Sequence, residues 1–320
     1  MVHAGRTESD PSKVPISSSY TRIVTVVCRV TFTSRRPSRY GFPVSFDPFY
    51  SLEILAQHVG GEVVPPSARG LEVSVVTASS ENPPARALFA ALKGTKTDGH
   101  TFVSRALSNG CVGAVVEDST TLGDAPGIVV KDTRTAYGKL VAFLAGCPSE
   151  QMRVIGITGT NGKTTTNWLL YNALNYLGTP CIRVGTLGIA AARVLDIPGG
   201  LTTPDPELVH SSLKRALQAR CSTAVFEVSS HALDQGRVDD VCFDVGVFTN
   251  LTRDHLDYHG TMEAYFAAKR RLFTLVADSP KKTRGAVINL DDPVGLELQR
   301  EIRALRLNDF SFGFHPEAPL

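Results

Sequence analysis

The residues best suited to chemistry in this sequence form a short segment that contains two glycines and a lysine. They are consecutive in the chain: Gly159, Thr160, Asn161, Gly162, Lys163, Thr164 and Thr165. Glycines let the backbone fold closely around a phosphate, and exposed N–H groups at a helix N-terminus favour its negative charge. The Lys163 ammonium can reach terminal phosphates, and the Thr164 hydroxyl can bind magnesium. The segment therefore predicts a site for ATP with Mg²⁺.

This segment lies between an apolar strand pattern over 153–158 and a helical pattern that begins at Lys163. The order of strand, loop and helix is the one that a phosphate-binding loop requires. The spacing GxxGKT is two residues shorter than the general GxxxxGKT pattern, because Ile157 stands where that pattern has its first glycine. An ordinary glycine-rich turn would need neither flanking element, so the context favours the phosphate site.

The rest of the chain alternates between short β-rich runs and helical patterns, which predicts an α/β fold. Continuous apolar runs are typical of a mostly parallel sheet covered by helices. The helical pattern over 133–145 ends at Gly146, a natural C-cap, so we expect a first domain to end there. Expected strands cover 72–77, 87–92, 112–116, 127–130, 153–158, 181–184, 223–228, 244–249 and 286–290. Expected helices cover 100–109, 133–145, 206–220 and 262–277, besides the helix from Lys163, and a further helix and strand are expected within 291–320.

Residues 1–46 differ in composition from the rest of the chain. Positions 11–46 contain no Asp or Glu and many Ser and Arg, a composition also found in organelle transit peptides. The apolar run 23–32 is interrupted by Arg29 and is too short to span a bilayer. We expect a disordered N-terminal extension and no membrane insertion.

The overall charge is nearly balanced, with 33 Lys and Arg residues against 31 Asp and Glu residues. Nucleic acid and anionic membranes are therefore not expected partners, and any anionic ligand must be held locally. The six cysteines are widely spaced and form no CxxC pair: Cys28, Cys111, Cys147, Cys181, Cys221 and Cys242. This pattern is typical of reduced thiols in a cytoplasmic protein.

Several further motifs occur in a fixed order along the chain. They are TGTNGKTTT from Thr158, EVSSHAL at 227–233, FTNLTRDHLDYHG at 248–260, the pair Ala268-Lys269 and INLDD at 288–292. Together they resemble the Mur ligases, over roughly residues 50–320. LFAALKGTKTDGHTFVSRAL at 88–107 is similar to the UDP-binding domain of this family. LTTPD at 201–205 and SSHALDQGRV at 229–238 resemble the members that form the tripeptide.

The resemblance implies a UDP-sugar-binding domain over 47–148 and a truncated P-loop ATP-binding domain over 149–320, with the C-terminal amino-acid-binding domain absent. It also implies the reaction, which belongs to peptidoglycan synthesis. ATP phosphorylates the D-glutamyl carboxylate of UDP-MurNAc-L-Ala-D-Glu, and a diamino acid then attacks the acyl phosphate. The diamino acid is meso-diaminopimelate or L-lysine. Activity of such a chain by itself is expected to be negligible.

The resemblance assigns catalytic roles to Lys163, His255 and Lys269. The implied Mg²⁺ ligands are Thr164, Glu227, His255 and the carbamate of Lys269. Glu227 closes an apolar strand, where a carboxylate can ligate magnesium beside the phosphate loop. Zinc binding by the two histidines of DHLDYH is disfavoured, because the Glu of HExxH is missing. Sequence alone favours an exposed Lys269 instead, since lysine is mostly exposed and two arginines follow it.

The substrate contacts implied by the resemblance lie in both domains. Those to the UDP-MurNAc dipeptide are Thr202, Thr203, Ser229, Gln235 and Arg237, and the uridine contact is Ser80. An arginine suits this role because its planar guanidinium binds carboxylates and phosphates through two hydrogen bonds. The alternative for the Thr-Thr-Pro segment is a simple helix cap.

The sequence departs from the family pattern around Ser80. Ser79 and Glu81 stand where the family usually has Asp and Arg, and Arg86 and Ala87 replace a common Gly-Asp. These changes affect the uridine contacts and leave the ATP site intact. Two alternatives remain open: a ligase of the folylpolyglutamate or cyanophycin synthetase type, and a non-catalytic nucleotide-binding module. Neither of these two synthetases should recognise the nucleotide sugar UDP-MurNAc-L-Ala-D-Glu.

Overall fold

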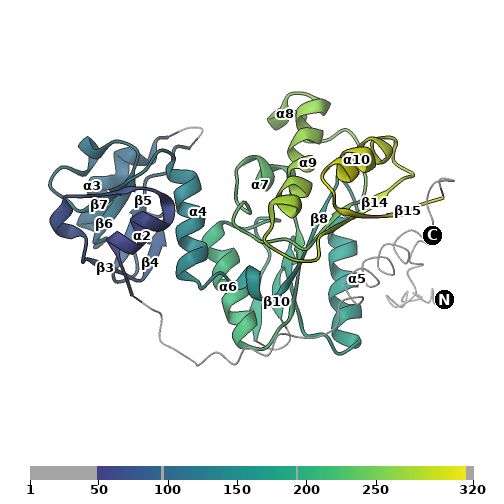
Figure 1. Cartoon of the computed structure of the whole chain (residues 1–320), viewed down its shortest axis with the longest axis horizontal. Helices are drawn as coiled ribbons and strands as arrows, with labels where there is room; N and C mark the ends of the chain where they lie inside the picture. Colours follow the sequence, from purple (N-terminus) through teal and green to yellow (C-terminus); the bar gives the residue numbers. More distant parts are fainter. Residues whose placement is uncertain (1–48, 95–96, 192–193, 315–320) are drawn as a thin grey trace, which may run out of the picture.

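The computed structural model describes residues 49–94, 97–191 and 194–314. These residues form two lobes that lie side by side, each built on its own β-sheet (Figure 1). The first lobe runs from β1 (Tyr50–Ser51) to α4 (Thr133–Leu144), and the second runs from β8 (Arg153–Thr158) to β15 (Asn308–Phe312).

The first lobe contains a five-stranded sheet in the order β2-β7-β6-β5-β4. Strands β4 to β7 run parallel, and β2 pairs antiparallel with β7 at one edge. The strands are β2 (Glu62–Val64), β4 (Val75–Thr77), β5 (Ala87–Ala90), β6 (Gly113–Val116) and β7 (Gly127–Val129), with β3 (Glu72–Val73) paired to β1 alone. The helices are α2 (Leu52–Val59), α3 (Val103–Ser108) and α4, and the short 3-10 helices are η2 (Pro66–Ala68), η3 (Gly99–Phe102) and η4 (Ser119–Leu122).

The core of the first lobe lies on both faces of this sheet, because successive side chains of a strand point to opposite faces. Leu88 packs on one face with Leu55 of α2 and Leu140 of α4. Phe89 packs on the other face with Ala106 of α3. Full burial of a Leu or Phe side chain contributes about 1.5–3 kcal/mol. Apolar burial therefore holds this lobe together.

The second lobe contains an eight-stranded sheet in the order β11-β10-β9-β12-β8-β13-β14-β15. The six strands from β9 to β15 in that order are parallel, and β10 and β11 extend one edge as antiparallel strands. The strands besides β8 and β15 are β9 (Cys181–Gly185), β10 (Gly188–Ala191), β11 (Leu195–Ile197), β12 (Thr223–Glu227), β13 (Val245–Phe248) and β14 (Gly285–Asn289). The 3-10 helix η5 (Pro148–Gln151) precedes β8.

Helices cover both faces of the second sheet. They are α5 (Lys163–Tyr176), α6 (Pro206–Gln218), α7 (Ser230–Asp234), α8 (Leu256–His259), α9 (Met262–Asp278) and α10 (Pro293–Ala304). Leu170 of α5 packs against Ile155, whereas Leu213 of α6 and Leu272 of α9 belong to the core that contains Val154. Helix α5 therefore covers one face, and α6 and α9 cover the other (Figure 1).

The parallel pairing decides which segments meet. β8 lies between β12 and β13, with Ile157 opposite Glu227 and Thr158 opposite Phe248. The carboxyl ends of these three strands therefore lie at one edge of the sheet, where ligands of open α/β sheets bind. The phosphate loop, Glu227 and the segment after β13 are brought together by this topology.

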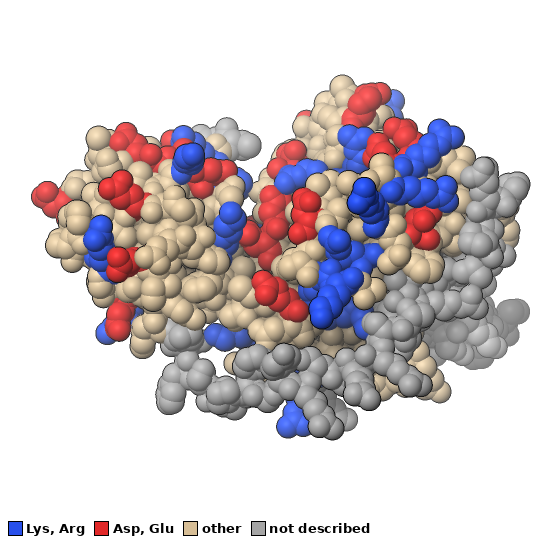
Figure 2. Space-filling view, viewed as in Figure 1, with Lys and Arg blue, Asp and Glu red and all other residues tan. Residues whose placement is uncertain are grey.

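The two lobes meet where α4 packs against α6. Gly138 of α4 lies so close to the second lobe that an added Cβ would be 2.0 Å from Asp240 Oδ2. A larger residue at this position would displace the Asp240 side chain. Figure 2 shows that the surface is hollowed between the lobes above this contact, with acidic and basic side chains interspersed over the face in view.

The structure confirms the predicted α/β class with a mostly parallel sheet covered by helices. The predicted strand over 72–77 is instead two strands, β3 and β4, which belong to different sheets. The helix predicted over 100–109 begins as the 3-10 turn η3, and only its second half is α-helical. Strands β1 and β2, helices α2, α7 and α8, and the antiparallel pair β10 and β11 were not predicted from the sequence.

The described residues contain five of the six cysteines. Cys111, Cys147, Cys181, Cys221 and Cys242 are free thiols. Among the helices within 49–314, none is long and apolar enough to cross a bilayer. The expected extension over 1–46 and Cys28 lie outside the described residues.

Candidate functional site

The phosphate loop, residues 159–162, connects β8 directly to α5, which begins at Lys163. Gly159 has a φ of 145° and Gly162 a φ of 84°, both in the region that favours glycine. At Gly159 an added Cβ would also lie 1.9 Å from Thr249 Oγ1. Only glycine fits this bend, so the loop has the compact backbone that a phosphate site requires.

The Lys163 side chain folds back over this loop. Its Nζ donates to the carbonyl oxygens of Gly159, at 2.9 Å, and Thr160, at 2.8 Å. Burial lowers the pKa of Lys163, and the charges of Glu227 and Asp254 oppose that shift. The ammonium is therefore positioned against the same backbone that would surround the phosphates.

The segment after β13 braces the phosphate loop from the neighbouring strand. The Thr160 N–H donates to the Asn250 carbonyl at 2.8 Å, and the Asn161 N–H donates to Asn250 Oδ1 at 3.0 Å. Thr249 Oγ1 donates to the Asn161 carbonyl at 2.7 Å, and the Thr252 N–H donates to Thr160 Oγ1 at 3.0 Å. These hydrogen bonds fix the geometry of the loop.

Glu227 lies at the end of β12 with a side chain that is 1% exposed. It accepts hydrogen bonds from Thr164 Oγ1 at 2.7 Å, from the Thr186 N–H at 2.9 Å and from Thr186 Oγ1 at 3.1 Å. Gly185 leaves room for it, because a Cβ there would lie 2.0 Å from Glu227 Oε1. A buried carboxylate beside a threonine hydroxyl offers the hard oxygen atoms that magnesium prefers.

Lys269, on α9, is 2% exposed and contacts the phosphate loop. Its Nζ donates to the Gly159 carbonyl at 2.7 Å and lies 4.3 Å from the centre of the Tyr265 ring. Burial and the nearby charge of Lys163 lower the pKa of Lys269 to about 6, against the opposing effect of Asp254. The amine is therefore largely neutral at pH 7, and the alternative of an exposed lysine is wrong.

The histidines of the site form one cluster. His255 is the N-cap residue that precedes α8 and has a φ of 52°, and its Nε2 lies 3.6 Å from Asp254 Oδ2. Its ring lies 4.8 Å from that of His231, edge to face, and His259 Nε2 lies 3.0 Å from Ser230 Oγ. Within the described ranges, no group of three or more His, Cys, Asp and Glu side chains converges on a position for a metal ion. Any metal bound by His255 needs ligands from other groups.

The two threonines before α6 lie beside Glu227. Thr203 Oγ1 donates to the Glu227 carbonyl at 2.8 Å and accepts from the Ser229 N–H at 3.0 Å. Thr202 Oγ1 lies 3.1 Å from Thr186 Oγ1. Asp205, not a threonine, is the N-cap residue of α6. The Thr203 hydroxyl therefore joins two loops of the site and does not cap the helix.

Arg237 and Gln235 lie against the loop that contains Thr202 and Thr203, which we name the threonine loop. Arg237 donates to Gln235 Oε1 through Nε at 2.9 Å and through Nη2 at 2.5 Å, and to the Thr203 carbonyl through Nη1 at 2.8 Å. Asp205 Oδ1 lies 3.7 Å from Arg237 Nε. The structure thus brings together the five expected dipeptide contacts of the second lobe.

Ser80 lies apart from these residues, in a turn of the first lobe that we name the Ser80 loop, residues 78–81. The Ser80 carbonyl accepts from Asn109 Nδ2 at 2.7 Å. Glu81, where the family usually has Arg, forms an ion pair of 2.5 Å with Arg105. The acidic residue that stands in place of the family's usual Arg is therefore paired with the exposed Arg105.

Three residues of the site were missed by the sequence analysis: Thr186, Asn250 and Thr252. Asn250 and Thr252 belong to FTNLTRDHLDYHG, so that motif contained a signal beyond its histidines. Thr186 lies in the turn between β9 and β10 and binds Glu227, which is 41 residues further along the chain. No local pattern connects these two positions.

Comparison with known proteins supports the same assignment. Residues 157–319 match the family model described as the Mur ligase middle domain. The chain therefore belongs to the Mur ligase family.

Curated relatives narrow the similarity within that family. A UDP-N-acetylmuramoyl-L-alanyl-D-glutamate--2,6-diaminopimelate ligase from Geobacter metallireducens is 43% identical over 245 residues, which cover 74% of this chain and 47% of the relative. The ligase of the same description from Aquifex aeolicus is 42% identical over 226 residues, covering 71% of this chain and 45% of the relative. The chain thus spans about half the length of the curated relatives it matches.

Solved structures agree in fold. A structure described as UDP-N-acetylmuramoyl-L-alanyl-D-glutamate--2,6-diaminopimelate ligase superposes with a TM-score of 0.71 at 26% identity, covering 84% of this chain and 53% of that one. MurF from Acinetobacter baumannii superposes with a TM-score of 0.62 at 24% identity, covering 84% of this chain and 54% of that one, which shows the shared fold alone.

Proposed function

We propose that this chain forms the nucleotide-sugar-binding and ATP-binding part of a ligase that adds 2,6-diaminopimelate to UDP-MurNAc-L-Ala-D-Glu. Its relatives from Geobacter metallireducens and Aquifex aeolicus are described as 2,6-diaminopimelate ligases, which supports this diamino acid over L-lysine. The first lobe would bind the UDP end of the substrate and the second lobe ATP and the dipeptide. Such a ligase would act in the cytoplasm in peptidoglycan synthesis, where ATP and nucleotide sugars are available.

One observation carries the proposal: a continuous path of polar contacts joins the phosphate loop to the threonine loop. Thr164 donates to Glu227, Glu227 accepts from Thr186, and Thr186 lies at hydrogen-bond distance from Thr202. Glu227 also accepts through its carbonyl from Thr203. A carboxylate substrate held at these threonines would lie beside the phosphates of ATP, as phosphoryl transfer between the two requires.

In the proposed reaction, a D-glutamyl carboxylate oxygen bonds to the terminal phosphorus of ATP, and the bond from that phosphorus to ADP breaks. The amine of diaminopimelate then bonds to the acyl carbon, the bond from that carbon to phosphate oxygen breaks, and the amine loses a proton. Lys163 and the N–H groups of the loop would stabilise the phosphoryl charge. Catalysis of this kind depends on positioning and charge neutralisation.

Thr164 and Glu227 are suited to hold magnesium at the terminal phosphates. Thr164 Oγ1 and Glu227 Oε2 are 2.7 Å apart, and Glu227 is buried. Thr164 lies in the first turn of α5, and Glu227 lies beside it at the end of β12. Magnesium bound there would supply positive charge to the phosphoryl group. His255 and Lys269 would serve a second ion.

We also propose that Lys269 is carbamylated. Its neutral amine can bond to the carbon of CO₂ and release a proton, which leaves a carboxylate on the side chain. An ammonium next to magnesium would be repelled, whereas a carbamate supplies oxygen ligands. The lowered pKa of Lys269, caused by burial and Lys163, supports this chemistry.

Calorimetric titration of this chain with UDP-MurNAc-L-Ala-D-Glu and with ATP and Mg²⁺ tests the proposal. Trp168, the one tryptophan of the chain, lies on α5 and provides a fluorescence signal for nucleotide binding. We expect saturable binding of both ligands, and loss of ATP binding in Lys163→Ala. Because the chain spans half of its relatives, we expect negligible amide formation by it alone.

Three results would contradict the proposal. Binding of a folyl glutamate in place of the nucleotide sugar would favour a folylpolyglutamate synthase. ATP binding without nucleotide-sugar binding would favour a nucleotide-binding module. Turnover near 1–10 per second by the chain itself, which is ordinary for an enzyme, would contradict the expectation that these two lobes alone form no amide.

A further inference from the structure

Glu207, near the start of α6, reaches from the second lobe to the first. Its Oε1 accepts a hydrogen bond from the Tyr137 hydroxyl of α4 at 2.7 Å and another from the Ala78 N–H at 2.9 Å. Tyr137 is buried, and burial together with the charge of Glu207 raises the pKa of Tyr137, so its hydroxyl remains a donor. One carboxylate oxygen therefore holds two separate parts of the first lobe.

The positions that Glu207 joins are significant because each lies beside a proposed substrate contact. Ala78 begins the Ser80 loop, two residues before Ser80. Glu207 itself follows Thr203 by four residues, and Thr203 is hydrogen-bonded to Ser229. A short chain of bonds thus runs from the uridine side of the site to the dipeptide side.

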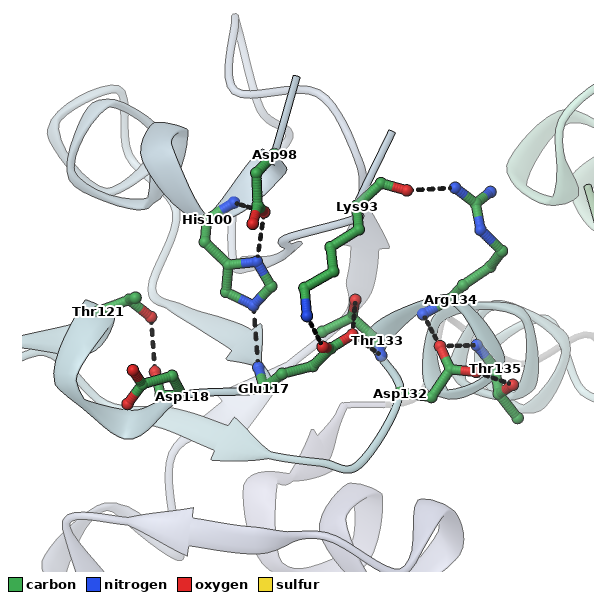
Figure 3. A network of polar contacts seen from close by, with 10 residues as sticks. All are labelled: Lys93, Asp98, His100, Glu117, Asp118, Thr121, Asp132, Thr133, Arg134 and Thr135. Carbon is green, nitrogen blue, oxygen red and sulfur yellow. Dashed lines mark hydrogen bonds and ion pairs between the residues drawn. The ribbon is translucent and has the colours of Figure 1, made fainter. Parts of the chain in front are cut away.

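Arg134, on α4, makes a second connection between the lobes. Its Nη2 donates to the Lys93 carbonyl at 2.7 Å, and its Nη1 donates to the Gln235 carbonyl at 3.4 Å. Lys93 belongs to the first lobe, and Gln235 is a proposed dipeptide contact of the second. Figure 3 shows the Arg134 guanidinium pointing at the Lys93 carbonyl.

The Lys93 end of this connection is itself anchored. The Lys93 ammonium pairs with Glu117, whose Oε1 accepts from the Thr133 N–H and hydroxyl, both at 3.1 Å (Figure 3). His100 Nε2 accepts from the Glu117 N–H at 2.9 Å. Arg134 is therefore attached to a fixed part of the first lobe and not to a free loop end.

We propose that Glu207 and Arg134 are positioning residues that set the distance between the uridine-binding and dipeptide-binding halves of the site. This inference rests on the proposed function, in which one ligand spans both lobes. When two halves of a ligand are linked, the second half binds at an effective concentration that depends on the span between its sites. Holding the lobes at the required span before binding also reduces the ordering needed on association.

The proposal predicts a specific pattern of affinities. Loss of either connection should weaken binding of the whole UDP-MurNAc-L-Ala-D-Glu about tenfold, because the distance between the two half-sites is then no longer fixed. UDP alone contacts one half, so its affinity should change less than about twofold. The affinity for ATP with Mg²⁺, which binds at the phosphate loop, should also remain within about twofold of the wild type.

Substitutions at Glu207 separate the hydrogen bonds from the side-chain volume. Glu207→Gln keeps an oxygen that can accept from Tyr137 and Ala78, and should bind the whole ligand as the wild type does. Glu207→Met removes the acceptor at similar volume and should show the tenfold loss. Arg134→Met should behave in the same way. Glu297→Met and Arg300→Met, on the exposed side of α10, are matched controls.

The experiment is calorimetric titration of the full chain and its variants with three ligands: UDP-MurNAc-L-Ala-D-Glu, UDP, and a non-hydrolysable ATP analogue with Mg²⁺. Hydrogen exchange at the Ala78 amide provides an independent measurement in the ligand-free protein. It should become faster in Glu207→Met and stay slow in Glu207→Gln, because only the first variant removes the acceptor.

Two results would overturn the inference while the proposed function stands. One is unchanged affinity for the whole ligand in Glu207→Met and Arg134→Met. The other is an equal loss for UDP and for the whole ligand, which would indicate damage to the first lobe and not a changed span. If the wild-type chain binds UDP but gains nothing from the MurNAc-dipeptide portion, the proposed function and this inference fail together.

Discussion

The phosphate-loop region of the second lobe and the Ser80 loop of the first differ in how far their polar groups are removed from water. Glu227 and Lys269 are buried, and each is hydrogen-bonded to backbone or hydroxyl groups of neighbouring segments. The side chains of Glu81 and Arg105 beside Ser80 are 64% and 55% exposed. Burying a charge without a partner is costly, whereas an exposed ion pair contributes about 0–1 kcal/mol.

This difference in burial fits the proposed division of function, with phosphoryl transfer in the second lobe and nucleotide-sugar binding in the first. The second lobe holds its polar groups in fixed positions, as the transfer of a charged phosphoryl group requires. The first lobe is stabilised by its apolar core and presents polar groups at its surface. Substitutions in the phosphate-loop region should therefore have large effects on chemistry, and substitutions around Ser80 small effects confined to one ligand.

The largest effect is expected at Lys269. In a fusion of this chain with the C-terminal portion of the Geobacter metallireducens relative, Lys269→Ala should reduce turnover at least about 100-fold, because the proposed oxygen ligands of the second ion are lost. Added formate or acetate should restore part of the activity by occupying the vacated positions. Lys282→Ala, at an exposed position, is the control. Full activity of Lys269→Ala without any added carboxylate would refute the proposed role.

The next effect concerns Glu227 and tests whether its charge, and not only its hydrogen bonds, serves the site. Glu227→Gln keeps an oxygen acceptor for Thr164 but removes the negative charge. The affinity for ATP with Mg²⁺ should fall about 10- to 100-fold, which corresponds to roughly 1.4–2.7 kcal/mol, while the weak binding of ATP without Mg²⁺ stays the same. Equal affinities of variant and wild type in Mg²⁺ would exclude Glu227 as a ligand.

The parts of the fold that were predictable share one physical property: their signals are local. The bounds of β8 and the start of α5 follow from an apolar run, two glycines and a lysine within a dozen residues. Helix α2 also has local signals, since Ser51 caps its start and Gly60 ends it in the left-handed conformation. It could therefore have been predicted, although it was missed.

The parts that were not predictable depend on pairing between distant segments. β10 and β11 are short, and only their contact with β9 and with each other makes them strands. The position of Thr186 beside Glu227 follows from the parallel pairing of β9 with β12. The burial of Lys269 likewise depends on how α9 packs, and its neighbours Arg270 and Arg271 gave the opposite indication.

A smaller effect, on stability, follows from the lowered pKa of Lys269, about 6 in the folded protein. An unfolded lysine has a pKa of about 10.4, so between these values the unfolded chain binds more protons and stability rises with pH. Met cannot bind a proton, so its replacement of Lys269 should stabilise the protein most at the low end of this range, near pH 6. The advantage should decline as the pH approaches 10.

Urea unfolding of the wild type and Lys269→Met from pH 6 to pH 10, in buffer free of CO₂, measures this difference. CO₂ must be excluded because a carbamate would change the charge of the side chain. Lys282→Met, which removes an exposed lysine, should show no such pH dependence. A difference between Lys269→Met and the wild type that is constant with pH would mean that the lysine is not neutral in the folded protein.

The smallest effect is expected in the first lobe, at Ser80. If its hydroxyl contacts uridine, Ser80→Ala should weaken UDP binding by about 0.5–1.5 kcal/mol, the usual contribution of one hydrogen bond, which corresponds to roughly 2- to 12-fold. The affinity for ATP with Mg²⁺ should not change, because the phosphate loop lies in the other lobe. Glu81→Ala removes only the exposed ion pair with Arg105 and should alter stability by less than about 0.5 kcal/mol. Calorimetry with UDP and with the ATP analogue, together with urea unfolding, distinguishes these cases. Loss of ATP affinity in Ser80→Ala would show that the two regions are coupled. A larger loss of UDP affinity in Glu81→Ala than in Ser80→Ala would indicate that uridine is contacted by Glu81, the residue at which this chain departs from its family, and not by Ser80.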